Sequence, residues 1–213
     1  AFAPPVKGLE PEDAFLMRTV EDALRFKDRL KKNDIKHAVV IGASMAGIKV
    51  VEVLHKYGIE TWLLDLASYI FPLAAYKEVA KEIEKRVEAQ GVHLMFGVTI
   101  DHMEQENGEK TAVLTDGSRI PADIVGLCIG TRAITETVQG EVEIGRGIVV
   151  DDHMRTSVPG IYAAGDCCEG NNLESGQNQI IGLWANANHQ GETAGINMAG
   201  GDMAYKGNIL HNI

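Results

Sequence analysis

The stretch that decides the fold of this chain is AVVIGASMAG, residues 38–47. Its first four residues are apolar and mostly β-branched, which predicts a short buried strand. After Gly47, the apolar residues Val50, Val51 and Leu54 recur at helical spacing. A strand, a glycine turn and a helix in this order predict the opening of a βαβ unit in a parallel sheet.

The glycines of this turn have the spacing of a dinucleotide-binding motif. Gly42 permits the tight turn out of the strand, and Gly47 lets the helix lie close to the sheet. Between them, free N–H groups at the helix N-terminus point to where a pyrophosphate would sit. Ser44 replaces the middle glycine. Its Cβ narrows the approach of a phosphate, whereas its hydroxyl can donate a hydrogen bond to that phosphate.

The next expected strand, residues 60–65, ends in Asp65, which follows Gly42 by 23 positions. The motif requires an acid about 20 residues on, where it binds the ribose 2′-hydroxyl. Leu66 and the two residues after it supply no cation for a 2′-phosphate. We therefore expect NADH to be preferred over NADPH at least tenfold, on the order of 1.4 kcal/mol. The structural alternative is an ordinary βαβ turn with Asp65 as a solvated strand end.

The composition is that of an ordinary globular protein, with 213 residues, 45% hydrophobic and 23% charged. A net charge of −10 argues against nucleic acid and anionic membranes as partners. No apolar run approaches the ~18 residues of a membrane span. Three cysteines without C-x-x-C spacing favour a cytoplasmic location over a secreted disulfide scaffold.

The remaining pattern predicts an α/β fold, a Rossmann-like, mostly parallel sheet with an antiparallel β insert. Thr19 is expected to cap a helix that runs to about Lys32, and residues 76–89 are expected to form a second helix. The antiparallel insert is expected to turn at Asn107-Gly108. The apolar run at residues 123–130 suits a central parallel strand. Short strands are also expected at residues 145–150 and 161–164. In the second helix, apolar residues spaced by four are expected to share a face, namely Val79, Ile83 and Val87.

A longer similarity appears in the second half of the chain. Residues 147–166, GIVVDDHMRTSVPGIYAAGD, closely resemble the second FAD-contacting segment of the pyridine nucleotide-disulfide oxidoreductase superfamily. Residues 18–30 resemble the first helix of its NAD domain, and residues 123–132 resemble its Ile-Gly-x-Arg strand end. Residues 183–200 resemble the helix that follows the FAD segment. The resemblance covers nearly the entire chain.

The resemblance implies a division of the chain into three parts. Residues 1–18 would connect to a first FAD half, residues 19–150 would form the NAD(H)-binding domain, and residues 151–213 would form a partial second FAD segment. The intact protein would be a homodimeric, FAD-dependent oxidoreductase that passes hydride from NADH to flavin. The chain alone would be catalytically incomplete and would purify without colour.

The resemblance also implies individual roles. The glycine turn would hold the NAD pyrophosphate, Asp65 would bind the adenosine ribose, and Gly130 would pack beside the nicotinamide half. Gly165 and Asp166 would contact FAD. Lys49 stands where the family usually has glutamate near the nicotinamide–flavin contact, so it either meets phosphate charge or is solvated. The cofactor-binding positions are Gly42, Ala43, Ser44, Met45, Ala46, Gly47, Lys49, Asp65, Gly130, Gly165 and Asp166.

Other reactive residues are interpreted as structural. Adjacent Cys167 and Cys168 close only a strained ring, so they are expected to be packing thiols, and Cys128 is expected in the core. The segment 151–153, Asp-Asp-His, is not expected to share a metal, because neighbouring strand residues point to opposite faces. No catalytic residue is assigned. Oxygen, a disulfide and a small electron-carrier protein remain open as acceptors, as does a non-catalytic dinucleotide-binding or redox-sensing module.

Overall fold

The computed structural model describes residues 5–72, 75–138 and 140–209. The chain divides into two compact units, residues 1–131 and residues 132–213, which are described separately. The division falls before the boundary that the sequence suggested at residue 150, so residues 132–150 belong to the second unit. None of the helices in the described ranges is long and apolar enough to cross a membrane.

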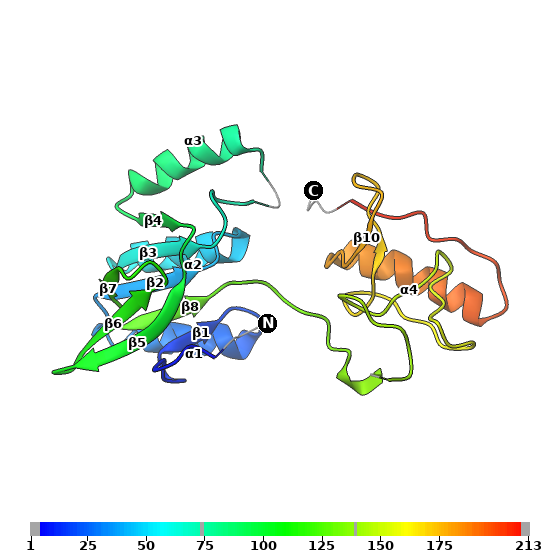
Figure 1. The fold of residues 1–213 in the computed structure, drawn as a ribbon, viewed down its shortest axis with the longest axis horizontal. Helices are drawn as coiled ribbons and strands as arrows, with labels where there is room; N and C mark the ends of the chain where they lie inside the picture. The colour runs from blue at the N-terminus through cyan, green and yellow to red at the C-terminus, as the bar shows by residue number, and fades with distance from the viewer. Residues whose placement is uncertain (1–4, 73–74, 139, 210–213) are drawn as a thin grey trace. The chain divides into compact units, whose positions relative to one another are not determined.

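The first unit is built on a five-stranded parallel sheet with the order β1-β8-β2-β3-β4 (Figure 1). Every neighbouring pair in this sheet is parallel, which confirms the predicted α/β class. Apolar runs without alternation form the central strands because both faces of the sheet are covered. The strands are β1 (Ala14–Leu16), β2 (His37–Ile41), β3 (Glu60–Asp65), β4 (His93–Phe96) and β8 (Ile124–Leu127).

Strand β1 lies inside the segment that was expected to be a connection. Ala14 pairs with Val125 and Leu16 pairs with Leu127, so β1 forms an edge of the sheet. Phe15 is buried against Phe26, with ring centroids 5.3 Å apart. This strand could not be predicted because it is only three residues long.

Three helices pack on one face of the sheet: α1 (Val20–Leu30), α2 (Met45–Lys56) and α3 (Lys77–Glu88). Figure 1 shows α1 beside β1 and α3 beside β4. Thr19 caps α1 as expected, and Asp22 completes the capping box. The predicted face of α3 is wrong at Val79, which is 53% exposed. Ala80, Ile83 and Val87 form the buried side instead.

The opposite face of the sheet is covered by the predicted antiparallel insert, which contributes to a second core. Its strands are β5 (Ile100–Glu106), β6 (Glu109–Leu114) and β7 (Arg119–Pro121), in the order β5-β6-β7. Asn107 and Gly108 both have positive φ, 53° and 86°. These angles suit the tight hairpin turn that the Asn-Gly pair predicted.

The second unit contains little regular structure apart from one helix, α4 (Trp184–Met198). A short 3₁₀ helix, η1 (Glu136–Val138), precedes the small ladder of β9 (Gly170–Asn171) and β10 (Asn178–Gln179). The strands expected at 145–150 and 161–164 are present only as isolated pairs, such as Ile148 with Cys168 and Arg155 with Tyr162. A separate apolar cluster around Ile148, Met154 and Ala194 forms the core of this unit.

Candidate functional site

The turn between β2 and α2 requires glycine at both predicted positions. Gly42 has φ +104°, and a Cβ there would lie closer than 3.0 Å to the Cys128 carbonyl oxygen. A Cβ on Gly47 would likewise lie closer than 3.0 Å to the Gly42 carbonyl oxygen. Such approaches are not tolerated by real side chains. The two glycines therefore let α2 start directly against the turn and against the end of β8.

Ser44 fits this turn without being glycine because its backbone is extended, with φ −91° and ψ 176°. Its Oγ caps α2 by accepting the N–H of Gly47 at 3.4 Å, and it donates to the Cys128 carbonyl at 3.2 Å. The Ser44 hydroxyl proton is thus donated to a backbone carbonyl of the protein. Ser44 shapes the turn in this structure, and donation to a phosphate would require that bond to break.

The donors open to an anion at this turn are the backbone amides of Met45 and Ala46. Both residues are exposed and belong to the first turn of α2. Within the described part of the chain, neither N–H has a hydrogen-bond acceptor. First-turn amides without partners carry the partial positive charge of a helix N-terminus. They lie where the sequence predicts that a pyrophosphate binds, and pyrophosphate binding there stays a prediction.

Asp65 lies at the end of β3 and is tied to the glycine turn. Its Oδ2 accepts the Ala43 N–H at 2.7 Å, and its Oδ1 accepts the Ala67 N–H at 2.8 Å. Each carboxylate oxygen has a further lone pair available for a hydroxyl donor. The solvated strand-end alternative is therefore too simple, because Asp65 is half-buried and directly bonded to the turn.

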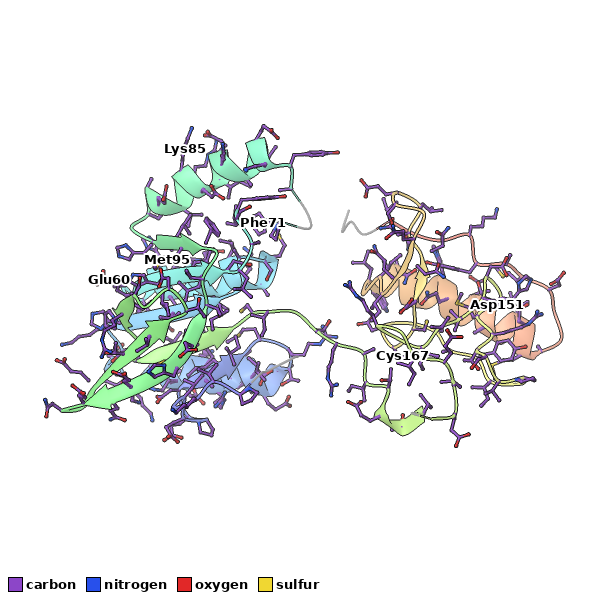
Figure 2. All side chains as sticks on the ribbon, viewed as in Figure 1. Glu60, Phe71, Lys85, Met95, Asp151 and Cys167 are labelled. Carbon is purple, nitrogen blue, oxygen red and sulfur yellow. The ribbon has the colours of Figure 1, made fainter. Side chains whose placement is uncertain are left out.

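The segment after Asp65 closes one side of the turn. Phe71 donates its N–H to the Ala43 carbonyl at 2.9 Å and has φ +54°, which is uncommon for a bulky residue. Leu66 is 70% exposed beside Asp65. Figure 2 shows Phe71 and Glu60 at opposite ends of this sheet, Glu60 being the first residue of β3. Phe71 therefore marks the carboxyl edge, where open α/β sheets bind ligands.

Lys49 does not turn toward the anion-binding amides. Its Nζ pairs with Glu52 Oε2 at 2.9 Å, and Lys56 pairs with the other oxygen at 2.8 Å. Its side chain is 73% exposed. Hydrogen bonds from both lysines lower the pKa of Glu52 to about 2. Lys49 is therefore solvated and paired with Glu52 in this structure, and contact with a bound phosphate stays a prediction.

Gly130 follows β8 at the same carboxyl edge. It is exposed and has φ +94°, a conformation that favours glycine. A Cβ there would meet no other atom within 4 Å. The glycine is therefore required by the backbone angle, and the edge beside it is open.

The two remaining predicted residues, Gly165 and Asp166, lie in the second unit. Gly165 is buried with φ +85°, and its N–H is accepted by Gln190 Oε1 at 2.8 Å. Asp166 follows on the exposed side of the turn, and its Oδ2 lies 3.7 Å from where a Cβ on Gly182 would be. Gly165 is required by its backbone angle, whereas a Cβ on Gly182 would make only an ordinary contact with the Asp166 carboxyl.

The three cysteines are free thiols, as the packing interpretation expected. Cys128 and Cys168 are buried, and Cys167 is half-buried. Burial raises the pKa of Cys128 to about 11 and that of Cys168 to about 12. Both buried thiols therefore stay protonated at neutral pH and are poor nucleophiles.

Residues 151–153 do not alternate between opposite faces, so the prediction that they do was wrong. This segment is a turn, and the ligand atoms of Asp151, Asp152 and His153 lie within 4.8 Å of one another. All three side chains nevertheless form hydrogen bonds within the protein. The Asp151 Oδ1 accepts the N–H groups of His153 and Arg155, both at 2.9 Å. The His153 ring bonds Asp152 at 2.6 Å and Asp202 at 2.9 Å.

Sequence reasoning missed several partners of the site. The carbonyl of Cys128, the amide of Ala67 and the backbone of Phe71 all act through main-chain atoms, which leave no residue-type signal. Gln190 is different, because a buried amide in a helix could have been found from its spacing with Asn186 and Asn197. These three residues are four and seven positions apart along α4, so they lie on one face of the helix.

Comparison with known proteins agrees with this geometry. Residues 1–191 match the model of a family described as pyridine nucleotide-disulphide oxidoreductase. An NADH oxidase from Enterococcus faecalis is 30% identical over 207 residues, which cover 96% of this chain and 46% of the relative. The chain thus spans about half the length of that relative.

Solved structures show the same similarity. The water-forming NADH oxidase from Lactobacillus brevis, bound to NADH, superposes with a TM-score of 0.86 at 27% identity, covering 96% of this chain and 45% of that one. An engineered NADPH oxidase made from that enzyme, bound to NADPH, has the same TM-score of 0.86, at 26% identity and with the same two coverages. Its substitutions include an aspartate replaced by alanine and an alanine replaced by arginine.

Proposed function

The chain belongs to the pyridine nucleotide-disulphide oxidoreductase family, and from this premise we propose that it is the NADH-binding part of an FAD-dependent oxidoreductase. Oxidoreductases among its relatives, including NADH oxidases, support the activity class. The second unit would supply one part of the FAD site. The partners would be dinucleotides, and the intact protein would be a homodimer.

One observation carries the proposal, namely the hydrogen bond between Asp65 and the Ala43 amide. It places a carboxylate beside the anion-binding turn, where the ribose next to a bound pyrophosphate would lie. A carboxylate accepts from a 2′-hydroxyl and repels a 2′-phosphate. Leu66, exposed at the next position, offers no cation. NADH is therefore the proposed cofactor, and loss of an aspartate in the engineered NADPH oxidase is in keeping with this choice.

The residues fit both dinucleotides. The Met45 and Ala46 amides would bind the pyrophosphate of NADH, and Asp65 would orient its adenosine ribose. Gly165 and Asp166 would hold hydroxyls of FAD. When bound, the two cofactors would supply the hydride-transfer chemistry, and the protein would supply their alignment. No side chain of this chain is assigned to acid–base work.

Three acceptors that would reoxidise the flavin stay open: oxygen, a disulfide and a small electron-carrier protein. The three free thiols support a reducing, cytoplasmic location for the protein. The buried and protonated state of Cys128 and Cys168 argues that neither of them is the redox cysteine of a disulfide-reducing mechanism. We expect the isolated chain to purify without bound flavin.

A fluorescence titration tests NADH binding directly. Trp62 lies in β3, the strand that ends in Asp65, whereas Trp184 is 93% exposed in the second unit. The W184F variant leaves Trp62 as the sole tryptophan emitter. Added NADH should quench the fluorescence of Trp62 saturably, and the emission of the nicotinamide should rise because energy is transferred from Trp62. A titration without saturation would contradict the proposal for the first unit.

A further inference from the structure

The buried face of α4 is polar where a core helix is usually apolar. Its buried polar residues lie three to four positions apart, so they share one face. Amides removed from water destabilise a fold unless they form hydrogen bonds. These residues are Asn186, Gln190, Thr193 and Asn197. A face of this kind needs specific partners, and two of them, Gly165 and His153, lie in the segment that resembles a flavin-contacting one.

Gln190 is the fully buried member beside the Gly165–Asp166 turn. Its Oε1 accepts the Gly165 N–H at 2.8 Å, which fixes which end of the amide is oxygen. The Cys168 thiol donates to the same oxygen at 3.5 Å. Because the pKa of Cys168 is raised to about 12 by burial, that thiol keeps its proton and remains a donor.

The other end of the Gln190 amide faces Gly170. A Cβ on Gly170 would lie 2.5 Å from Nε2, so any larger residue there would displace the Gln190 amide. Nε2 is buried and has no hydrogen-bond acceptor among the residues that the structure describes. An unpaired buried donor costs stability. The Gln190 amide therefore lies between Gly165 and Gly170, the two ends of the loop that contains Asp166. The unpaired Nε2 lowers the stability of the folded unit.

Asn186 holds a second stretch of backbone, the one that precedes Gly182. Its Nδ2 donates to the Ile181 carbonyl at 2.9 Å, and its Oδ1 accepts the Tyr205 hydroxyl. Ile181 precedes Gly182, the residue that lies against the Asp166 carboxyl. Both backbone stretches around Asp166 are thus held by amides from α4.

We propose that Gln190 is a positioning residue, which holds the Gly165–Asp166 turn in the shape that presents Asp166 to a flavin dinucleotide. The inference rests on the proposed function for the identity of that ligand. Gly165 adopts φ +85° with its amide paired to Gln190, so the turn has little freedom while the bond is intact. Gln190 itself would touch no cofactor.

Amide hydrogen exchange followed by NMR on the ¹⁵N-labelled chain tests the anchor. Q190M keeps the volume but removes the acceptor, and we expect exchange at the Gly165 amide to accelerate at least tenfold. Q190E keeps an oxygen within reach and should restore slow exchange. N188M is the matched control, since Asn188 is exposed on the same helix. Unchanged exchange at Gly165 in Q190M would overturn the proposal.

Titration of FAD into the same samples tests whether the hydrogen bond between Gln190 and Gly165 affects flavin binding. In the wild-type chain FAD should shift the Gly165 and Asp166 amide signals. Q190M should weaken this response at least tenfold, with Q190E close to wild type and NADH affinity unchanged in both. If FAD shifts neither signal in the wild type, the assignment of the flavin fails, while the exchange experiment still decides whether Gln190 anchors the turn. A Q190M response equal to wild type would overturn the positioning role.

Discussion

The carboxylate of Asp65 accepts the backbone N–H of Ala43 across 2.7 Å, which joins the end of β3 to the glycine turn that follows β2. The two residues are 22 positions apart in the chain. The bond makes the expected ribose site and the expected pyrophosphate site one continuous structure. A change at Asp65 should therefore affect both the stability of the turn and the choice of dinucleotide.

Asp65→Asn should weaken NADH binding roughly tenfold, about 1.4 kcal/mol. The amide group can accept one of the two backbone N–H groups but presents its NH₂ to the other, so one hydrogen bond is lost. The affinity for NADPH should fall less, because the charge that repels a 2′-phosphate has been removed. Isothermal calorimetry with both dinucleotides measures the two changes.

A second variant separates local structure from charge. Glu78→Gln removes one negative charge from the exposed surface of α3 and should leave both affinities unchanged. Equal losses for NADH and NADPH in the Asp65 variant would mean that Asp65 supports the turn without discriminating at the ribose.

Gly47→Ala should destabilise the first unit by about 1–3 kcal/mol, because the new methyl group overlaps the Gly42 carbonyl. NADH binding should fall with it, since α2 must move away from the turn. Gly191→Ala is the matched control, because a Cβ on this exposed helical glycine meets nothing within 4 Å. That substitution should stabilise by up to about 1 kcal/mol. Urea unfolding of both variants gives the comparison, and equal midpoints would argue against the close approach at Gly47.

Lys49→Ala should change NADH affinity by less than about twofold and stability by less than about 0.5 kcal/mol. The reason is that Lys49 pairs with Glu52 in solvent and is not directed at the turn. Lys56→Ala removes the other partner of Glu52 and serves as the control. A tenfold loss of NADH affinity in the Lys49 variant alone would show that Lys49 reaches the cofactor in the bound state.

The second unit should lose stability as the pH rises from 6 to 8, in part through His153. The hydrogen bond to Asp152, with help from Asp202, raises the pKa of His153 above its ordinary value. A raised pKa in the folded state means that the stabilisation is complete below about pH 6.5, the unfolded value, and is lost as the pH passes the folded pKa. His153→Gln should therefore flatten this part of the curve of urea midpoint against pH. His102 also has a raised pKa, so wild type and variant must be compared at each pH.

The parts of the fold that the sequence predicted are those decided by local chemistry. Gly42 and Gly47 were found because their backbone positions tolerate no other residue, and Thr19 was found because a cap is made within one helical turn. Val79 was misplaced because residues four apart drift around a helix of 3.6 residues per turn. Val79 is two such steps from Val87 and has rotated off the buried side, whereas Ala80, seven residues from Val87, remains on it.

The parts that the sequence did not predict depend on distant partners. Residues 145–150 have the composition of a strand, but Ile148 finds only single bridging partners in the folded unit. The spacing of Gln190 could indicate a buried polar face of α4, but its partner could not be predicted, since its acceptor oxygen bonds the Gly165 amide 25 positions away. The metal argument at Asp151 failed for a related reason, because the segment is a turn and the alternation of a strand does not apply to it.

Asp65 and the glycine turn are proposed to form an NADH site, and parallel calorimetric titrations of the wild-type chain with NADH and NADPH test this proposal. We expect saturable NADH binding at one site, with NADPH binding at least tenfold weaker. Equal affinities would contradict the role of Asp65 at the ribose. Absence of binding by either dinucleotide would contradict the site itself.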